Sequence, residues 1–299
     1  MIIEMKAKAP YRQAVRRIVD APGVSDILIL LARNGWLPQA LESRLRARVR
    51  IRQGLVSAAL PDGASVSLWH NPSSADITTK VYWDGFAGYE NGTPSFFFDR
   101  CRKAHRVLDI GANIGYYSIL ALLANPESEV VAFEPVPQFY DCLKRNIELN
   151  QLTLRITALN LAVGDQCGEI PLYLPNNGVL CESSILPAFR PDSTQLRVEA
   201  TTVDKFLKDR DISSVDLIKI DVEGAEHLVF QGMANTLEKM HPDLICEVLP
   251  GRFRPETEEQ LTRLGYKFSW IRDGKLVPMR RLQPDAQYRD PNFYFSTHL

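Results

Sequence analysis

Acidic side chains stand at the ends of two short apolar runs, where they could act on protons or metal ions. Asp221 follows the run Leu217–Ile220, Glu223 comes two residues later, and Glu247 lies near the end of a later apolar run. A carboxylate can serve as a general base, and two carboxylates close together can instead bind Mg²⁺. Lys219 lies within the first run and requires a partner if that run is a buried strand. We therefore expect Lys219 to tune the charge of Asp221 or to hold a substrate.

A glycine-bounded turn at 111–115 is the second feature that could bind a ligand. It follows an apolar run, and Gly111 and Gly115 would let the backbone approach a ligand closely and present unpaired N–H groups. Asn113 stands where a dinucleotide-binding fingerprint needs its middle glycine. This replacement disfavours a bound pyrophosphate, so a ligand without a phosphate at this turn suits the segment better.

Glu134 follows Gly115 by 19 residues, at the end of the next apolar run. An acidic residue at this place in a Rossmann-like sheet accepts hydrogen bonds from both hydroxyls of a ribose and repels a 2′-phosphate. Turn and carboxylate together predict an adenosine-type ligand. The alternative is that the two glycines merely permit a tight turn and that Glu134 is a solvated strand end.

Alternating strands and helices must position these residues. The apolar patterns predict helices over 116–124, 137–150, 225–233 and 256–264. They predict strands over 106–110, 129–134, 154–163, 217–221 and 244–248, and a closing pair of strands over 266–271 and 292–296. Such alternation is typical of βαβ units around a parallel sheet. We therefore predict a doubly wound α/β domain over residues 106–299, with the acidic residues and the glycine turn at one edge of its sheet.

Residues 1–105 are predicted to form an accessory region of helices and one β-hairpin on the acceptor side of the domain. Helical spacing occurs within 11–34 and after Pro38, and a hairpin pattern spans 55–69. Arginines alternate with apolar residues over 44–52, as in a strand or a helix-to-strand transition. This stripe fits a solvated face, a site for an anionic substrate group or a patch for an acidic membrane surface, and we favour the first.

Composition excludes several classes of protein. The 299 residues are 45% hydrophobic and carry 35 Lys and Arg against 36 Asp and Glu, which excludes a disordered or fibrous chain and argues against a dedicated DNA-binding protein. The first 55 residues are the basic part, with eleven Lys and Arg against four Asp and Glu. Five dispersed cysteines fit reduced thiols, and no run is long enough for a membrane helix or placed as a signal peptide. We therefore expect a cytoplasmic protein.

Four motifs together resemble the FkbM-type S-adenosylmethionine (SAM)-dependent methyltransferases, a family of class I methyltransferases. The motifs are residues 107–115, Phe133-Glu134-Pro135, Ala162-Val163-Gly164-Asp165 and the block 219–226. The resemblance covers about residues 60–250. It implies a Rossmann-like, mostly parallel sheet of seven strands. It also implies methyl transfer from SAM, commonly to a hydroxyl oxygen of a sugar, a polyketide or a similar metabolite.

Carried onto this sequence, the resemblance implies a role for each matching residue. The turn 111–115 would hold the methionine part of SAM, Glu134 the ribose, and the strand end at 162–163 the adenine. The residues assigned to the cofactor are Asp109, Gly111, Ala112, Asn113, Gly115, Glu134, Pro135, Ala162, Val163 and Asp165. The residues assigned to catalysis are Asp221, Lys219 and Glu223, together with Glu247 from its place at a strand end.

These observations predict a SAM-dependent methyltransferase that acts on a hydroxyl of a small molecule or glycan-type acceptor. Asp221 is the candidate base, and we favour metal-free catalysis over Mg²⁺ held by Asp221 and Glu247. The rival functions are an NAD(P)-dependent oxidoreductase, a non-catalytic nucleotide-binding module, and a protein or RNA methyltransferase. Ser183 and Ser184 fit a loop over the substrate or an ordinary loop, and we favour the ordinary loop. The sequence determines neither the acceptor nor the oligomeric state.

Overall fold

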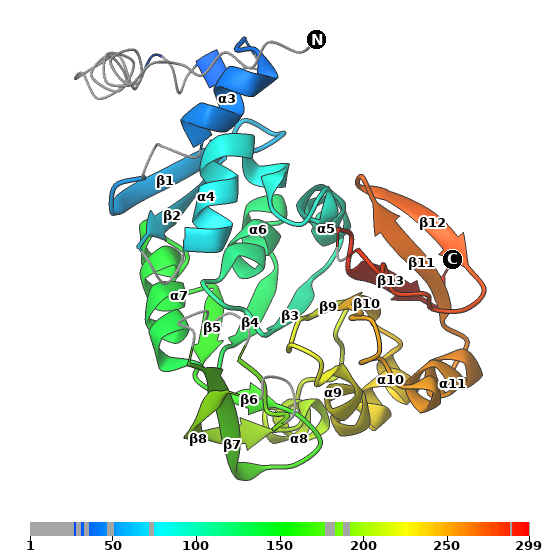
Figure 1. Ribbon diagram of the computed structural model, residues 1–299. Helices are drawn as coiled ribbons and strands as arrows, with labels where there is room; N and C mark the ends of the chain where they lie inside the picture. Colours follow the sequence, from blue (N-terminus) through cyan, green and yellow to red (C-terminus); the bar gives the residue numbers. More distant parts are fainter. Residues whose placement is uncertain are drawn as a thin grey trace. The chain divides into compact units, whose positions relative to one another are not determined.

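The computed structural model describes residues 27, 31–32, 36–46, 51–71, 75–176, 183–187, 192–287 and 289–298 (Figure 1). The chain forms two compact units, Met1–Arg52 and Gln53–Leu299. In the first unit, α3 (Gln39–Arg46) begins after Pro38 and includes the first arginines of the alternating stripe. Residues 47–50 of that stripe, and most of the predicted helical region 11–34, lie outside the described residues. The last two residues of the stripe, Ile51 and Arg52, belong to no helix or strand. The sequence-based boundary at 105/106 separates an acceptor-side region from a cofactor-binding domain. It does not coincide with the boundary between the two compact units, and it stays a prediction.

An eight-stranded sheet forms the centre of the second unit, in the order β12-β11-β13-β10-β9-β3-β4-β5 (Figure 1). Its strands are β3 (Arg106–Ile110), β4 (Glu129–Phe133), β5 (Ile156–Leu159), β9 (Leu217–Ile220), β10 (Asp243–Glu247), β11 (Lys267–Arg272), β12 (Lys275–Met279) and β13 (Asn292–Ser296). The five strands from β10 to β5 are mutually parallel, and β13 pairs antiparallel with both β10 and β11. The predicted doubly wound, mostly parallel α/β fold is confirmed.

The sheet has eight strands and not the seven that the family resemblance implied. The additional strand, β12, pairs antiparallel with β11, and Arg272 stands opposite Lys275 in their register. The two residues between them, Asp273 and Gly274, have φ values of 48° and 72°. Two successive left-handed residues form the type of tight turn that matches the twist of a hairpin. This Asp-Gly turn folds the chain back on β11 and adds the eighth strand.

Helices cover both faces of the sheet (Figure 1). On one face lie α5 (Thr93–Cys101), α6 (Tyr116–Ala124) and α7 (Pro137–Leu149). On the other lie α8 (Val203–Asp209), α9 (Glu226–Gly232), α10 (Ala234–Met240) and α11 (Pro255–Arg263), whose apolar side chains pack on β3, β4, β9 and β10. Because both faces are covered, β9 is buried along its whole length. Among the described helices, none has the length and hydropathy needed to cross a bilayer.

The predicted hairpin is confirmed as β1 (Gly54–Ala59) and β2 (Ser65–His70). Asn146 of α7 and Asn150, which caps the C-terminus of this helix, supply hydrogen-bond partners for the backbone of β2. Asn150 accepts a hydrogen bond from the Ser67 N–H at 3.0 Å and donates to the Ser67 carbonyl at 2.7 Å, and Asn146 accepts from the Trp69 N–H at 2.7 Å. These bonds fasten the hairpin to the helix. The helix α4 (Ala75–Asp84) follows the hairpin along the chain.

The predicted strand over 154–163 is divided between two sheets. Its first part is β5, whereas β6 (Ala162–Val163) joins β7 (Gly168–Pro175) and β8 (Ser193–Thr201) in a separate three-stranded sheet. Between β5 and β6, the Asn160 side chain donates hydrogen bonds to the carbonyls of Glu134 and Pro135. These bonds hold the chain at the point where it leaves the main sheet.

We predict that Gly111→Ala destabilises the protein by at least about 3 kcal/mol, because a Cβ atom there would lie 1.8 Å from the Asp221 carbonyl oxygen. Gly63→Ala is the matched control, since Gly63 has a similar φ of 88°, against 82° at Gly111, but open space around its Cα. It should cost about 1 kcal/mol. Urea denaturation measures both values. Equal losses would show that close approach of the two chain segments does not constrain residue 111.

Candidate active site

A cavity of about 750 Å³ lies at the carboxyl ends of the central parallel strands. Residues at or directly after the ends of β3, β4, β9 and β10 line it, among them Ile110, Phe133, Asp221 and Glu247. Open α/β sheets bind their ligands at this edge, where the turns after parallel strands converge. The sequence-predicted glycine turn and acidic residues are therefore brought together around one space.

The turn after β3 is held against the end of β4. The N–H groups of Gly111 and Ala112 both donate hydrogen bonds to the Phe133 carbonyl, at 3.0 and 2.9 Å. Gly111, Asn113 and Gly115 have positive φ values of 82°, 52° and 82°. A side chain at Gly115 would contact Leu143, with a Cβ 2.3 Å from its Cδ1 atom. The two glycines thus permit a compact left-handed turn whose residues 111–113 line the cavity.

Glu134 joins the turn after β3 to the end of β4. Its Oε2 atom accepts a hydrogen bond from the Asn113 N–H at 2.7 Å, and its Oε1 atom accepts from the Val136 N–H at 2.8 Å. The side chain lines the cavity, although the residue is only 4% exposed. Burial raises the pKa of Glu134 to about 7, against the lowering effect of the two backbone hydrogen bonds. Each oxygen of an ionised carboxylate can accept a second hydrogen bond, so Glu134 keeps acceptor capacity for a ligand.

The other predicted cofactor residues divide into two groups. Pro135, Ala162 and Val163 line the cavity together with the turn. Asp109, Gly115 and Asp165 do not belong to its lining. Asp109 is buried behind the cavity wall, where it accepts a hydrogen bond from the Ser118 hydroxyl at 2.6 Å. Burial raises the pKa of Asp109 to about 6, although the Ser118 hydrogen bond and Lys219 lower it. Asp165 is exposed.

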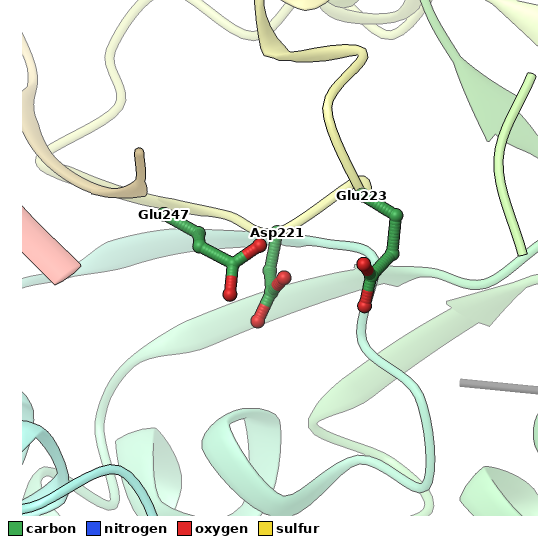
Figure 2. A group of neighbouring side chains, drawn as sticks. All are labelled: Asp221, Glu223 and Glu247. Carbon is green, nitrogen blue, oxygen red and sulfur yellow. The ribbon is translucent and has the colours of Figure 1, made fainter. Parts of the chain in front are cut away.

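Three carboxylates gather at the ends of β9 and β10 (Figure 2). Asp221, Glu223 and Glu247 each offer an oxygen, and these three oxygens lie within 4.8 Å of one another. Glu223 reaches the group through a left-handed backbone conformation, with a φ of 54°. Burial, followed by repulsion from Asp221 and Glu223, raises the pKa of Glu247 well above its ordinary value. The cluster can take up protons or hold a cation.

Lys219 lies directly behind this cluster and is fully buried. Its Nζ atom is 3.1 Å from Asp221 Oδ2 and 5.0 Å from the centroid of the Tyr117 ring. Burial alone would lower the pKa of Lys219, but the charges of Asp221 and Glu90 raise it well above its ordinary value. Lys219 therefore carries a positive charge that fixes the position of Asp221. It does not line the cavity.

Glu90 is a residue of this site that sequence reasoning missed. It accepts hydrogen bonds from the Tyr117 hydroxyl and, at 3.0 Å, from the Asn292 side chain. Tyr117 therefore contacts both Glu90 and the Lys219 ammonium group. Burial raises the pKa of Glu90, whereas Lys219 lowers it. Glu90 belongs to no motif and lies far from residue 219 in the sequence, so no local pattern could have shown their proximity.

The cavity contains further lining residues outside the predicted set. Asp76 and Ile77 of α4, and Tyr89, line it. Ser183 and Ser184 also line it, and the Ser184 hydroxyl donates a hydrogen bond to the Glu223 carbonyl at 2.9 Å. The favoured interpretation of the two serines as ordinary loop residues missed their place at the cavity.

Glu226 closes the turn that follows β9. Its Oε1 atom accepts hydrogen bonds from the N–H groups of Gly224 at 3.0 Å and Val222 at 3.4 Å. Burial raises the pKa of Glu226 to about 7, despite these bonds. The residue lies outside the cavity lining. Glu226 therefore shapes the segment that presents Glu223.

Comparisons with known proteins point to one family. The family model of the methyltransferase FkbM domain matches residues 109–268. The chain is 29% identical over 192 residues to methyltransferase sdnD of Sordaria araneosa, an alignment that covers 54% of this chain and 73% of that protein. It is 27% identical over 172 residues to the 31-O-demethyl-FK506 methyltransferase FkbM of Streptomyces tacrolimicus, covering 46% of this chain and 65% of that protein.

Among solved structures, the chain is similar to methyltransferase FkbM from Methylobacillus flagellatus KT. Its sequence is 16% identical, and it aligns with a TM-score of 0.41 over 76% of this chain and 55% of that chain.

We predict that Lys219→Met lowers the free energy of unfolding by about 3–5 kcal/mol at pH 8, because the variant leaves buried carboxylates without the ammonium group that faces them. The loss should be smaller at pH 5, since the raised pKa of Glu90 lets this group become neutral more easily. Urea denaturation at both pH values measures the effect. Lys205→Met is the matched control, because Lys205 pairs with Asp209 on the exposed face of α8 and should matter little. An equal effect of the two variants would contradict the assigned role of Lys219.

Proposed function

The chain belongs to the FkbM methyltransferase family, and we propose that it transfers the methyl group of SAM to a hydroxyl of a small molecule or glycan-type acceptor. One observation carries this proposal. A single cavity contains both a buried carboxylate suited to a ribose, Glu134, and a cluster of carboxylates suited to a reacting hydroxyl.

The residues of the cavity fit the cofactor that we propose. Glu134 would accept hydrogen bonds from the ribose hydroxyls with the lone pairs that the two backbone N–H groups leave free. The turn 111–113 would hold the methionine part, and Ala162 and Val163 would lie against the adenine. When bound, SAM supplies an activated methyl group, whose bond to sulfur breaks as the acceptor oxygen bonds to the methyl carbon. Asn113 in place of a glycine continues to disfavour the NAD(P) alternative.

The carboxylate cluster provides a general base that accepts the proton of the acceptor hydroxyl. A neutral alcohol is a weak nucleophile, so its O–H bond must weaken as the oxygen attacks. We assign Asp221 as the group that accepts this proton, and Lys219 as the group that holds Asp221 in place through its 3.1 Å hydrogen bond. The cavity also holds the two reacting groups close together, which is the larger part of what this reaction needs from a protein.

The acceptor side of the cavity supports a hydroxyl-bearing substrate. Asp76, Tyr89 and Ser183 line the cavity, and their polar side chains would orient an acceptor there. Asp76 and Tyr89 belong to residues 1–105, which supports the predicted role of this region in covering the acceptor. The name of the Streptomyces tacrolimicus relative describes a protein that methylates an oxygen. This name favours oxygen as the methyl acceptor here too.

Glu134→Ala should weaken the binding of S-adenosylhomocysteine about 100-fold, because it removes two hydrogen bonds to a charged acceptor. Isothermal titration calorimetry measures the change. Glu129→Ala is the matched control, since Glu129 stands at the exposed start of the same strand, β4, and pairs with Arg106. It should leave binding unchanged. Tight binding by the Glu134 variant would remove this residue from the ribose site.

The same carboxylate should make ribose binding depend on pH. Because the pKa of Glu134 is raised to about 7 in the free protein, a proton must leave before both oxygens can accept from the ribose. Affinity for 5′-methylthioadenosine, which lacks the titratable amino acid, should fall about tenfold per pH unit below pH 7. A constant affinity between pH 5.5 and 8 would show that Glu134 is already ionised or does not contact the ribose.

Asp221→Asn should lower methyl transfer at least about 100-fold while leaving S-adenosylhomocysteine affinity within about threefold, because it removes the proton acceptor but not the nucleoside site. Transfer of labelled methyl groups to a panel of sugar and polyketide alcohols measures the first effect. Asp99→Asn is the control, since Asp99 is an exposed partner of Arg102 on α5. Full activity of the Asp221 variant would exclude Asp221 as the base.

A further inference from the structure

The three carboxylates at the ends of β9 and β10 already have the spacing of ligands around one ion (Figure 2). Their nearest oxygens all lie within 4.8 Å of one another. An ion that binds oxygen at about 2.1–2.4 Å separates opposite ligands by about 4.2–4.8 Å and adjacent ligands by less. Asp221 and Glu247 belong to the ends of neighbouring parallel strands, so the sheet itself fixes their separation.

Glu247 provides an independent sign that something is bound here. Its Oε2 atom is inaccessible to solvent and has no hydrogen-bond partner among the described residues. A buried carboxylate oxygen without a donor is costly, so such an atom normally has a partner that satisfies it. The side chain points toward the carboxylate of Asp221, which already accepts from Lys219 (Figure 2). Another carboxylate supplies no proton donor when ionised, whereas a cation between the two would satisfy both.

The charges favour a doubly charged ion. The three carboxylates in their ionised forms carry three negative charges, and the Lys219 ammonium group bonded to Asp221 returns one. A divalent cation would neutralise the charge of −2 that this ammonium group leaves. Arg252 also lines this cavity. An experiment must therefore distinguish a bound ion from an arginine that acts as the counter-charge.

We propose that Asp221, Glu223 and Glu247 bind one divalent cation of the Mg²⁺ and Mn²⁺ class. The ligand set consists of carboxylate oxygens alone, which suits these hard ions better than Zn²⁺ or copper. Three protein ligands leave coordination positions for water and for an acceptor hydroxyl. The sequence pattern favours a metal-free base over Mg²⁺ held by Asp221 and Glu247. In the structure, Glu223 adds a third carboxylate at the same place, through its left-handed backbone conformation.

The role of the ion rests on the proposed function, whereas its binding does not. A hydroxyl that coordinates a divalent cation is more acidic than a free one, because the charge stabilises the alkoxide. The ion would thereby ease the loss of the hydroxyl proton to the Asp221 carboxylate. It would also fix the direction from which the acceptor approaches the methyl group.

Titration of the full chain with Mn²⁺, followed by calorimetry and by the paramagnetic resonance of free Mn²⁺, tests the proposal without any methyl acceptor. We expect one Mn²⁺ per chain, displaced by Mg²⁺. Asp221→Asn, Glu223→Gln and Glu247→Gln should each weaken Mn²⁺ binding at least tenfold. Glu199→Gln is the matched control, since Glu199 is an exposed acidic residue of β8, and it should bind Mn²⁺ like the unaltered chain.

Two results would overturn the cation site. The first is no Mn²⁺ binding at millimolar concentration, which would leave Arg252 as the counter-charge of the cluster. The second is binding that none of the three substitutions weakens, which would place the ion elsewhere. Binding of S-adenosylhomocysteine to each variant shows that it is folded. The same measurement distinguishes failure of the cation site from failure of the proposed function. A chain that binds S-adenosylhomocysteine but not Mn²⁺ contradicts only the cation site, and a chain that binds Mn²⁺ but not S-adenosylhomocysteine contradicts only the proposed function.

Discussion

A fully buried ammonium group, that of Lys219, sets the charge at the carboxyl edge of the sheet. A cation without water must have anionic partners close by, and here they come from distant parts of the chain. Asp221 comes directly after β9, the strand that contains Lys219, whereas Glu90 precedes α5 and reaches the same place through Tyr117. The requirement to neutralise one lysine therefore ties the segment before α5 to the central strand. It also holds one catalytic candidate, Asp221, at the edge of the cavity.

The topology of the parallel strands explains why one cavity can serve two chemical tasks. Strands β4 and β3 end beside each other and present Glu134 and the glycine turn, which suit the nucleoside side of a cofactor. Strands β9 and β10 end next to them and present the carboxylate cluster. Gly111 lets the turn after β3 approach the Asp221 backbone closely. A donor and an acceptor bound at these adjacent ends would meet between them.

The sequence predicted well those strands and helices that depend on local residue patterns. Strands β3, β4 and β9 and helices α6 and α7 lie within a residue of the predicted ranges, because apolar periodicity and glycine position determine them. The Asp273-Gly274 pair is a typical hairpin sequence, but the expectation of seven strands did not take it into account. Glu90 could not be found, because its place depends on tertiary contacts with Tyr117 and Asn292. Motif matching likewise could not show that Asp109 lies behind the cavity wall.

The most direct test of this account is a crystal structure of the chain with S-adenosylhomocysteine bound. The account predicts that both ribose hydroxyls lie within hydrogen-bond distance of the Glu134 carboxylate, and that the sulfur faces the carboxylates at the ends of β9 and β10. A nucleoside bound elsewhere, or a ribose that does not contact Glu134, would contradict the account.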